Sequence, residues 1–283
     1  AQLAKGNFAP ESISVTDLFM GALLPGLCLV VLYILWQIIY ANIYPDRMPA
    51  IPKSERDALE FKELRNRVLK VLIPPLLLIC AVLGSILMGL ATPTESAGVG
   101  AIGAIILAFT RKQLSFKILK EVATSTAQTT SMVFTILIGA AMFSLVFRGF
   151  GGDDIVADFL MNLEGGVVTA IIITMVLMFI LGFFLDFIEI IYVVLPIIGP
   201  AILMMDINPL WFAIMIAVNL QTSFLTPPFG FALFYLRGVA PKSVLTTDIY
   251  KGAIPFVLIQ ILMLVILSIF PQLATWLPSI MYK

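Results

Sequence analysis

The segment NLQTSFLTPPFGF, from Asn219 to Phe231, lies between two apolar stretches and cannot form a continuous helix. Neither Pro227 nor Pro228 has an N–H group to donate to the preceding turn. In a helix, the carbonyl oxygens of Ser223 and Phe224 would therefore lose their i+4 donors. A membrane tolerates such a break only where protein or a water-filled cavity surrounds it. The segment therefore predicts either a binding site at mid-span or a kink that neighbouring helices repair.

The composition of the chain is that of a membrane protein. Of its 283 residues, 60% are hydrophobic and 12% are charged, and the mean hydropathy is +1.07. An average soluble domain is about 25% charged. Apolar runs of about 18 residues or more predict an all-α, polytopic membrane protein in a lipid bilayer. The net charge of zero argues against nucleic acid as a partner, and the lack of histidine excludes imidazole metal ligands and histidine acid–base catalysis.

Basic residues indicate which side of the membrane each loop faces. Seven of the 17 basic residues follow the first predicted span, Asp17 to Tyr40, in the stretch from Ala41 to Lys70. The positive-inside rule places this loop in the cytoplasm and the acidic stretch 149–166 outside. In the first half of the chain, the predicted order is a span at 17–40, an interfacial helix at 54–68, a span at 71–90, a break at 91–96 and a span at 97–110 with small residues for close packing. A second interfacial helix at 115–126 and a span at 132–147 follow, and then an outer loop. The last predicted elements are a hairpin at 167–205, a broken helix at 210–238 and a span at 253–270. The tryptophans near span ends are predicted to be interfacial belt residues: Trp36, Trp211 and Trp276.

The apolar stretch from Val167 to Met205 is too short to cross the membrane twice. The segment from Gly182 to Glu189 divides it into two arms of 15 residues, about 22 Å of helix each. The hydrocarbon core is about 30 Å thick, so we expect a re-entrant hairpin that enters from the outer face. Its tip places two carboxylates at membrane depth, at a cost of about 2.5–3.5 kcal/mol each. Asp186 can coordinate an ion, or it can cap the second arm while Glu189 pairs with a cation elsewhere.

The break near Pro227 combines three features of an ion or carboxylate site. Carbonyl groups at the end of the first half-helix carry partial negative charge, which suits Na⁺. N–H groups at the start of the next half-helix suit a carboxylate, and Gly230 lets a ligand approach the backbone. The candidate ion- or substrate-binding residues are Gly182, Asp186, Glu189, Asn219, Thr222, Ser223, Thr226, Pro227 and Gly230.

A third break, ATPTES from Ala91 to Ser96, is predicted near the outer face because the preceding span is long enough to cross. Thr94 is predicted to cap the next helix, with Glu95 in its first turn, where negative charge is favourable. We expect Thr92, Thr94 and Glu95 to serve gating or structure rather than binding.

Four motifs together resemble the large membrane subunit, the DctM-like M subunit, of TRAP (tripartite ATP-independent periplasmic) transporters. The resemblance runs from about Ser14 to Phe270 and is carried by SVTDLFMGALLPGL at 14–27, GLATPTESAGVGAIGA at 89–104, GFFLDFIEIIYVVLPIIGPAILMMDINPLWF at 182–212 and NLQTSFLTPPFGFALF at 219–234. It implies an elevator-type secondary transporter of the bacterial or archaeal inner membrane, with no enzymatic activity. Such a transporter imports an organic acid, for example a C4-dicarboxylate or sialic acid, with Na⁺ as coupling ion and no cofactor.

The resemblance also implies partners and positions. A periplasmic binding protein, the P subunit, would deliver the substrate, and a small membrane subunit, Q, would brace the scaffold. Residues 1–130 would form scaffold helices with two cytoplasmic arm helices, and residues 131–283 would form half of the transport domain. One sodium site would lie between the hairpin tip and the broken helix, near Gly182, Asp186 and Thr226.

One departure from the family pattern concerns the first repeat. Family members have a preceding repeat, with a first hairpin rich in glycine and serine and its own Pro-Pro break, and we expect this sequence to hold only the second repeat, whose hairpin and break are described above. We therefore expect the substrate site to need an N-terminal half of the large subunit, as another part of a longer chain or as a separate polypeptide.

Other functions compatible with the sequence are a binding-protein-independent carboxylate/Na⁺ symporter half, a non-catalytic scaffold or channel subunit, and an intramembrane hydrolase. The hydrolase would need a second acid facing Asp186, and Asp206 is predicted to lie outside the membrane.

Overall fold

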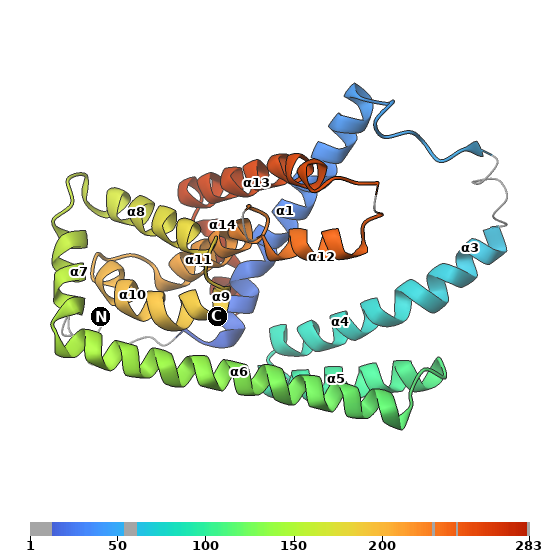
Figure 1. The fold of residues 1–283 in the computed structure, drawn as a ribbon, viewed down its shortest axis with the longest axis horizontal. Helices are drawn as coiled ribbons and strands as arrows, with labels where there is room; N and C mark the ends of the chain where they lie inside the picture. The colour runs from blue at the N-terminus through green and yellow to red at the C-terminus, as the bar shows by residue number, and fades with distance from the viewer. Residues whose placement is uncertain (1–12, 54–60, 228–229, 242, 282–283) are drawn as a thin grey trace. The chain divides into compact units, whose positions relative to one another are not determined.

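The computed structural model describes residues 13–53, 61–227, 230–241 and 243–281, and these residues form helices joined by turns (Figure 1). Among them, five helices are long and apolar enough to cross a membrane. These are Val15–Ile43, Lys62–Leu87, Pro93–Thr110, Phe116–Gly149 and Thr246–Ile269. The prediction of an all-α, polytopic membrane protein is therefore confirmed.

The chain divides into two compact units, and both α1 (Val15–Ile43) and α6 (Phe116–Gly149) contribute to each of them. The first unit contains residues 21–30 and those from 127 onward, and the second contains residues 14–20 and 31–126. The prediction that residues 1–130 act as a scaffold and residues 131–283 as a transport half concerns function, and it stays a prediction.

In the second unit, α3 (Phe61–Arg67), the π-helical turn η1 (Val68–Leu72) and α4 (Ile73–Leu87) follow one another without a break. The predicted arm helix is therefore not separate from the span: its residues 54–60 lie outside the described residues, and the rest runs on into α4. Pro74 has no N–H to donate to the carbonyl of Lys70, and the guanidinium of Arg111 donates to that oxygen instead. The predicted i,i+4 pair is confirmed, with Arg67 Nη2 2.8 Å from Glu63 Oε1.

The helices α4 and α5 (Pro93–Thr110) form a hairpin in this unit. A Cβ placed on Gly100 would lie 3.2 Å from Val82 Cγ2, so the predicted close packing of the small-residue stretch is confirmed. At the same interface the hydroxyl oxygens of Ser85 and Ser96 share a hydrogen bond of 2.8 Å.

The helix α6 is one element of 34 residues where the sequence analysis predicted an interfacial helix followed by a separate span. The separation is wrong because no proline or glycine occurs from Ser115 to Ile138 to interrupt the helix. At 1.5 Å per residue, α6 is about 51 Å long, well beyond the thickness of a hydrocarbon core of about 30 Å.

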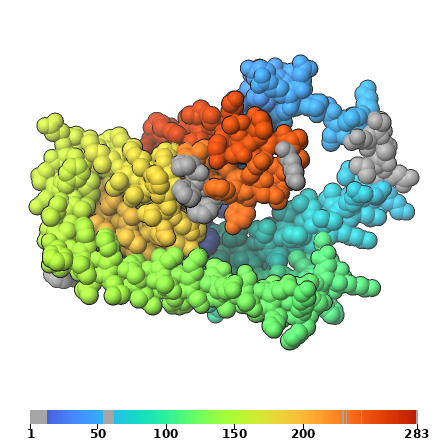
Figure 2. All heavy atoms as spheres, viewed as in Figure 1, coloured from blue at the N-terminus to red at the C-terminus, as the bar shows by residue number. Residues whose placement is uncertain are grey.

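The predicted hairpin belongs to the first unit. Its first arm is α8 (Gly166–Leu181), and its second arm runs without interruption through α9 (Phe187–Glu189), η2 (Ile190–Val194) and α10 (Leu195–Leu203). The helices α8 and α10 run side by side (Figure 1), and α7 (Gly152–Met161) packs against both of them. The helix α7 occupies a stretch that the sequence analysis treated as a loop. In Figure 2, α7 and α8, in green to yellow-green, pack against each other on the visible face.

The most buried helix of this unit is α11 (Pro209–Ser223), which packs against α8, α13 (Thr246–Ile269) and α14 (Gln272–Met281). The belt position predicted for Trp211 is wrong, because its indole is buried and Nε1 donates to the carbonyl oxygen of Leu267 at 2.8 Å. After α11 the chain breaks and resumes as α12 (Phe231–Val239), which confirms the predicted interruption of the helix.

Candidate functional site

The hairpin tip packs directly against the end of α11. The backbone of Gly182 lies so close to Ser223 that a Cβ added to the glycine would be 2.5 Å from the serine Cβ. The tip makes a second contact with the end of α11, where the rings of Phe187 and Phe224 meet edge to face with their centroids 5.5 Å apart. The structure therefore brings together the two breaks that the sequence analysis paired.

The carboxylates of the tip form a capping box. Asp186 has extended backbone and is the N-cap of the second arm, and its Oδ1 accepts a hydrogen bond of 2.8 Å from the N–H of Phe187. Glu189 reaches back, and its Oε2 accepts from the N–H of Asp186 at 3.3 Å. The cap that the sequence analysis considered for Asp186 is present, and Glu189 completes it instead of pairing with a distant cation. Whether Asp186 also contacts an ion stays a prediction.

Backbone hydrogen bonds rearrange where α11 ends. The N–H of Thr226 donates to the carbonyl oxygen of Ser223 at 3.1 Å, and the N–H of Leu225 donates to that of Thr222 at 3.2 Å. The carbonyl that proline deprives of its i+4 donor thus gains an i+3 donor. Pro228 and Phe229 lie outside the described residues, and the next helix starts with Gly230 as its N-cap. The buried Gly230 would place a Cβ 3.0 Å from the carbonyl oxygen of Phe224, so its lack of a side chain lets the chain fold tightly after the break.

Three residues near the break have hydroxyl groups, and each hydroxyl donates to a carbonyl oxygen three or four residues earlier in the chain. Thr222 donates to Val218 at 2.8 Å, and Ser223 donates to Leu220 at 2.6 Å. Thr226 donates to Thr222 at 3.0 Å. Because the hydrogen of each hydroxyl is used in this way, the lone pairs of its oxygen are oriented for an acceptor role. Such oxygens suit a hard cation, and the same hydrogen bonds would also repair a simple kink.

Asn219 has a packing role in this arrangement. Its side chain is 2% exposed, and Nδ2 donates to the carbonyl oxygen of Met175 in α8 at 2.8 Å. This bond ties the first arm of the hairpin to α11 one turn before the break. Pro227, the described proline of the pair, is half-buried.

The candidate gating residues belong to the α4–α5 hairpin. The cap of α5 is Thr92 and not Thr94, because Pro93 begins the helix and Thr92 is the residue with extended backbone. Thr92 Oγ1 accepts from the N–H of Glu95 at 3.3 Å, and Glu95 Oε2 accepts from the N–H of Thr92 at 2.7 Å. This turn is a capping box on an exposed surface, and it confirms the predicted placement of Glu95 in the first turn.

Two aromatic residues of the site, Phe187 and Phe224, were not identified from the sequence. Each flanks a break, in GFFLDFIE and in TSFLTPPFG, but the sequence contains 21 phenylalanines and offers no way to pair these two. Their contact depends on the way the hairpin packs against α11.

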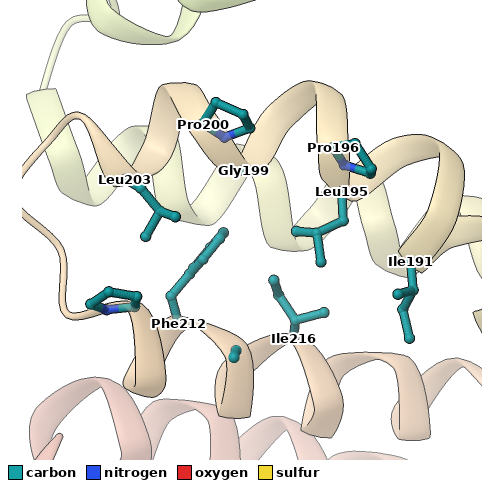
Figure 3. Close-up of a pocket in the computed structure, with 10 residues that line it drawn as sticks. Ile191, Leu195, Pro196, Gly199, Pro200, Leu203, Phe212 and Ile216 are labelled. Carbon is teal, nitrogen blue, oxygen red and sulfur yellow. The ribbon is translucent and has the colours of Figure 1, made fainter. Parts of the chain in front are cut away.

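An apolar groove of about 350 Å³ separates the second arm from α11. Leu195 and Leu203 point into it from α10, and Phe212 points toward them from α11 (Figure 3). All ten lining residues are apolar or glycine, so this groove suits hydrocarbon rather than an ion or a carboxylate. The polar atoms of the candidate site lie at the tip and the break instead.

Comparison with known proteins agrees with the resemblance seen in the motifs. Residues 8–273 match the family model described as the DctM component of the tripartite ATP-independent periplasmic transporter. A sialic acid TRAP transporter permease protein of Haemophilus influenzae is 30% identical over 99% of this chain and 44% of its own length. A sialic acid TRAP transporter large permease protein of Vibrio cholerae is 26% identical over 95% of this chain and 61% of its own. A C4-dicarboxylate TRAP transporter large permease protein of Rhodobacter capsulatus is 27% identical over 96% of this chain and 60% of its own.

The chain thus spans between 44% and 61% of the length of these relatives. Together with the long apolar helices, they place it in the bacterial inner membrane as a multi-pass protein. By its residues 8–273, this chain is a member of the DctM component family of tripartite ATP-independent periplasmic transporters.

Proposed function

We propose that this chain forms part of the large membrane subunit of a TRAP transporter that imports an organic carboxylate together with Na⁺. The observation that carries the proposal is the contact between the hairpin tip and the broken helix, where Gly182 packs on Ser223 and Phe187 on Phe224. Discontinuous helices that meet in this way are typical of ion and substrate sites in secondary transporters. The proposal assigns transport, and no covalent chemistry, to the chain.

The coupling ion would bind near Gly182, Asp186 and Thr226. The donors available there are backbone carbonyl groups of the tip and of the break, together with hydroxyl oxygens whose hydrogens are already donated. Neutral oxygen donors and a nearby carboxylate match the ligand preference of a hard monovalent cation. Asp186 would contribute negative charge while its Oδ1 holds the cap.

The substrate class is inferred from the relatives. Their names record sialic acid, C4-dicarboxylates and ectoine as substrates. We infer that this chain also serves a small organic carboxylate, delivered by a periplasmic binding protein and transported with the help of a small membrane subunit. Because the relatives are longer than the matched region, further parts of the large subunit would complete the substrate site.

Coupling would follow from differential binding. Na⁺ and substrate that bind only when the tip lies against the break would stabilise that state, and the loaded transport domain would then move as an elevator. An ion that bound equally well to a displaced tip would give no coupling.

The test is transport by the complete complex. The large and small membrane subunits are reconstituted in proteoliposomes, and uptake of a panel of carboxylates is measured with the binding protein present and an inward Na⁺ gradient. We expect uptake of at least one carboxylate that needs both. Uptake that is unaffected by replacing the Na⁺ gradient with K⁺ would refute the coupling, and uptake without the binding protein would favour an independent symporter.

A further inference from the structure

A pocket of about 400 Å³ lies between α6 and the second arm of the hairpin. The groove beside α11 has an apolar lining, whereas this pocket is lined by polar as well as apolar side chains. The polar ones are Ser144 and Arg148 of α6 and Tyr192 of η2. All of its lining residues belong to the first unit, so the pocket is formed within one compact part of the chain.

The positive charge in this pocket is not compensated by the protein. Arg148 is exposed in the last turn of α6, and among the described residues no carboxylate lies within ion-pair distance of its guanidinium. The pocket lining itself contains no acidic residue. The end of the helix dipole stabilises a cation here without any ligand, so the charge is free to attract an anion at no cost to the fold.

Two hydroxyl groups in the pocket are also available to a ligand. Neither Ser144 Oγ nor Tyr192 Oη makes a hydrogen bond within the part of the chain that the structure describes, whereas Thr135 of the same helix donates to a carbonyl oxygen four residues earlier. Both side chains are accessible, and Tyr192 is 39% exposed. Hydroxyl and guanidinium donors that line one pocket match the oxygens of a phosphate or a carboxylate.

The polar and apolar residues of the pocket are ordered along α6. Arg148 and Ser144 lie toward the end next to α7, and Leu137 is eleven residues before Arg148, about 16 Å along the helix. That length is about the depth of one leaflet, since the hydrocarbon core is about 30 Å thick. The small side chains of Ala140 and Ala141 lie between them and leave room for a hydrocarbon chain. A free anion would use only the polar end of this pocket, and a phospholipid would use both ends.

We propose that this pocket binds an anionic phospholipid from the leaflet on the side of α7. Its phosphate oxygens accept hydrogen bonds from Arg148, Ser144 and Tyr192. The upper part of one acyl chain lies along Ala140 and Leu137. Phosphatidylglycerol fits better than a zwitterionic lipid, because the pocket offers a cation and no carboxylate for an ammonium group. The site is separate from the tip and the break, and it depends on the membrane location of the chain and not on Na⁺ coupling.

The probes are phosphatidylglycerol and phosphatidylcholine with the same photoreactive acyl chain, added in equal amounts to the complete transporter complex in nanodiscs. We expect phosphatidylglycerol to label peptides 137–148 and 192–196 about five-fold more strongly than phosphatidylcholine does. Arg148→Gln should lower its labelling to the level of phosphatidylcholine, whereas Arg148→Lys keeps the charge and should retain most of the preference. Ala141→Phe puts a large side chain at an exposed position of the pocket, and it should remove the labelling of these peptides by both lipids.

The matched control is Lys120→Gln, which removes one positive charge from an exposed residue of the same helix, away from the pocket. It should leave the five-fold preference unchanged. Excess glycerol phosphate separates a lipid from a free anion, and it should compete poorly because it has no acyl chain. Equal labelling of these peptides by both lipids in the unaltered complex would show a general interfacial anchor and overturn the proposal. Labelling of neither peptide would also overturn it, and full competition by glycerol phosphate or by a transported carboxylate would assign the pocket to a soluble anion instead.

Discussion

The two helical hairpins of the chain, α4–α5 and α8–α10, begin their second helix with the same local device. In both, an N-cap side chain and a glutamate three residues later form a capping box: Thr92 with Glu95, and Asp186 with Glu189. In both hairpins a π-helical turn also precedes a proline, with η1 before Pro74 and η2 before Pro196. The local structure of the two turns is therefore very similar.

The surroundings of the two turns differ. The Thr92 turn is exposed to the outside of its unit, and Gly98, in the first turns of α5, has nothing within 4 Å of the position where a Cβ would stand. The Gly182 turn is pressed against Ser223, and Phe187 rests on Phe224. A capping box therefore builds a helix start in either place, and only the contact with a second broken helix turns one of them into a candidate site.

The largest effect is expected from Gly182→Ala. The new Cβ would stand 2.5 Å from Ser223 Cβ, so the tip must move away from the break. Overpacking costs about 1–3 kcal/mol, and we expect Na⁺-driven uptake by the complete complex to fall about ten-fold or more. The matched change Gly98→Ala adds the same methyl group to open space in the other hairpin and should leave uptake unchanged.

The double variant Gly182→Ala with Ser223→Gly separates a local clash from general damage. Removing the serine side chain restores room for the new methyl group, so part of the uptake should return. If Gly182→Ala alone transports like the unaltered complex, the tip is not held against the break in the working protein.

The second effect distinguishes the two capping residues. Thr92→Ala and Asp186→Ala should each lower the free energy of unfolding by about 1 kcal/mol, because each removes an N-cap. Asp186→Asn keeps the cap and removes the charge. We expect it to raise the Na⁺ concentration that gives half-maximal uptake by about five-fold, equivalent to about 1 kcal/mol. A Na⁺ dependence in Asp186→Asn that matches the unaltered complex would assign Asp186 to capping alone.

Local signals in the sequence predict where α11 ends and where the second arm of the hairpin begins. The pair Pro227 and Pro228 ends α11 close to where the missing N–H groups require it, and the acidic tip begins the second arm at Asp186. The charge pair of Glu63 and Arg67 also forms as its i,i+4 spacing predicts. These features depend on neighbours a few residues away, so a sequence contains what is needed to find them.

Features that depend on tertiary packing were missed or misplaced. Trp211 has the position of an interfacial residue in the sequence, yet its indole N–H finds the Leu267 carbonyl 56 residues away. The stretch 149–166, which contains α7, has five glycines and two adjacent aspartates and was predicted to be a loop, yet α7 packs on both arms of the hairpin. The burial of Thr174 follows from the same packing. No periodicity within one helix reveals which neighbour will cover it.

The third effect concerns a hydroxyl at the break. Thr226 and Thr135 make the same kind of bond, each donating to the carbonyl oxygen four residues earlier. Thr226→Val should raise the half-maximal Na⁺ concentration about three-fold if its oxygen is a cation ligand, since one neutral donor contributes roughly 0.5–1 kcal/mol. Thr135→Val, on an exposed face of α6, should leave the Na⁺ dependence as it is. Equal behaviour of the two variants would show that the hydroxyl of Thr226 only repairs the kink.

The smallest expected effect is a change in stability, and it concerns the buried hydroxyl groups inside the two hairpins. The α4–α5 hairpin pairs its inner hydroxyls, with Ser85 Oγ 2.8 Å from Ser96 Oγ, whereas Thr174 in α8 has no partner among the described residues. Ser96→Ala should therefore lower the free energy of unfolding by about 1 kcal/mol, and Thr174→Val should raise it by about the same amount. Thermal unfolding of the delipidated complex measures both changes, and uptake should stay unaltered in Thr174→Val because the residue lies away from the tip and the break. A loss of stability in Thr174→Val would mean that the hydroxyl is satisfied in the working protein, and the difference between the interiors of the two hairpins would then disappear.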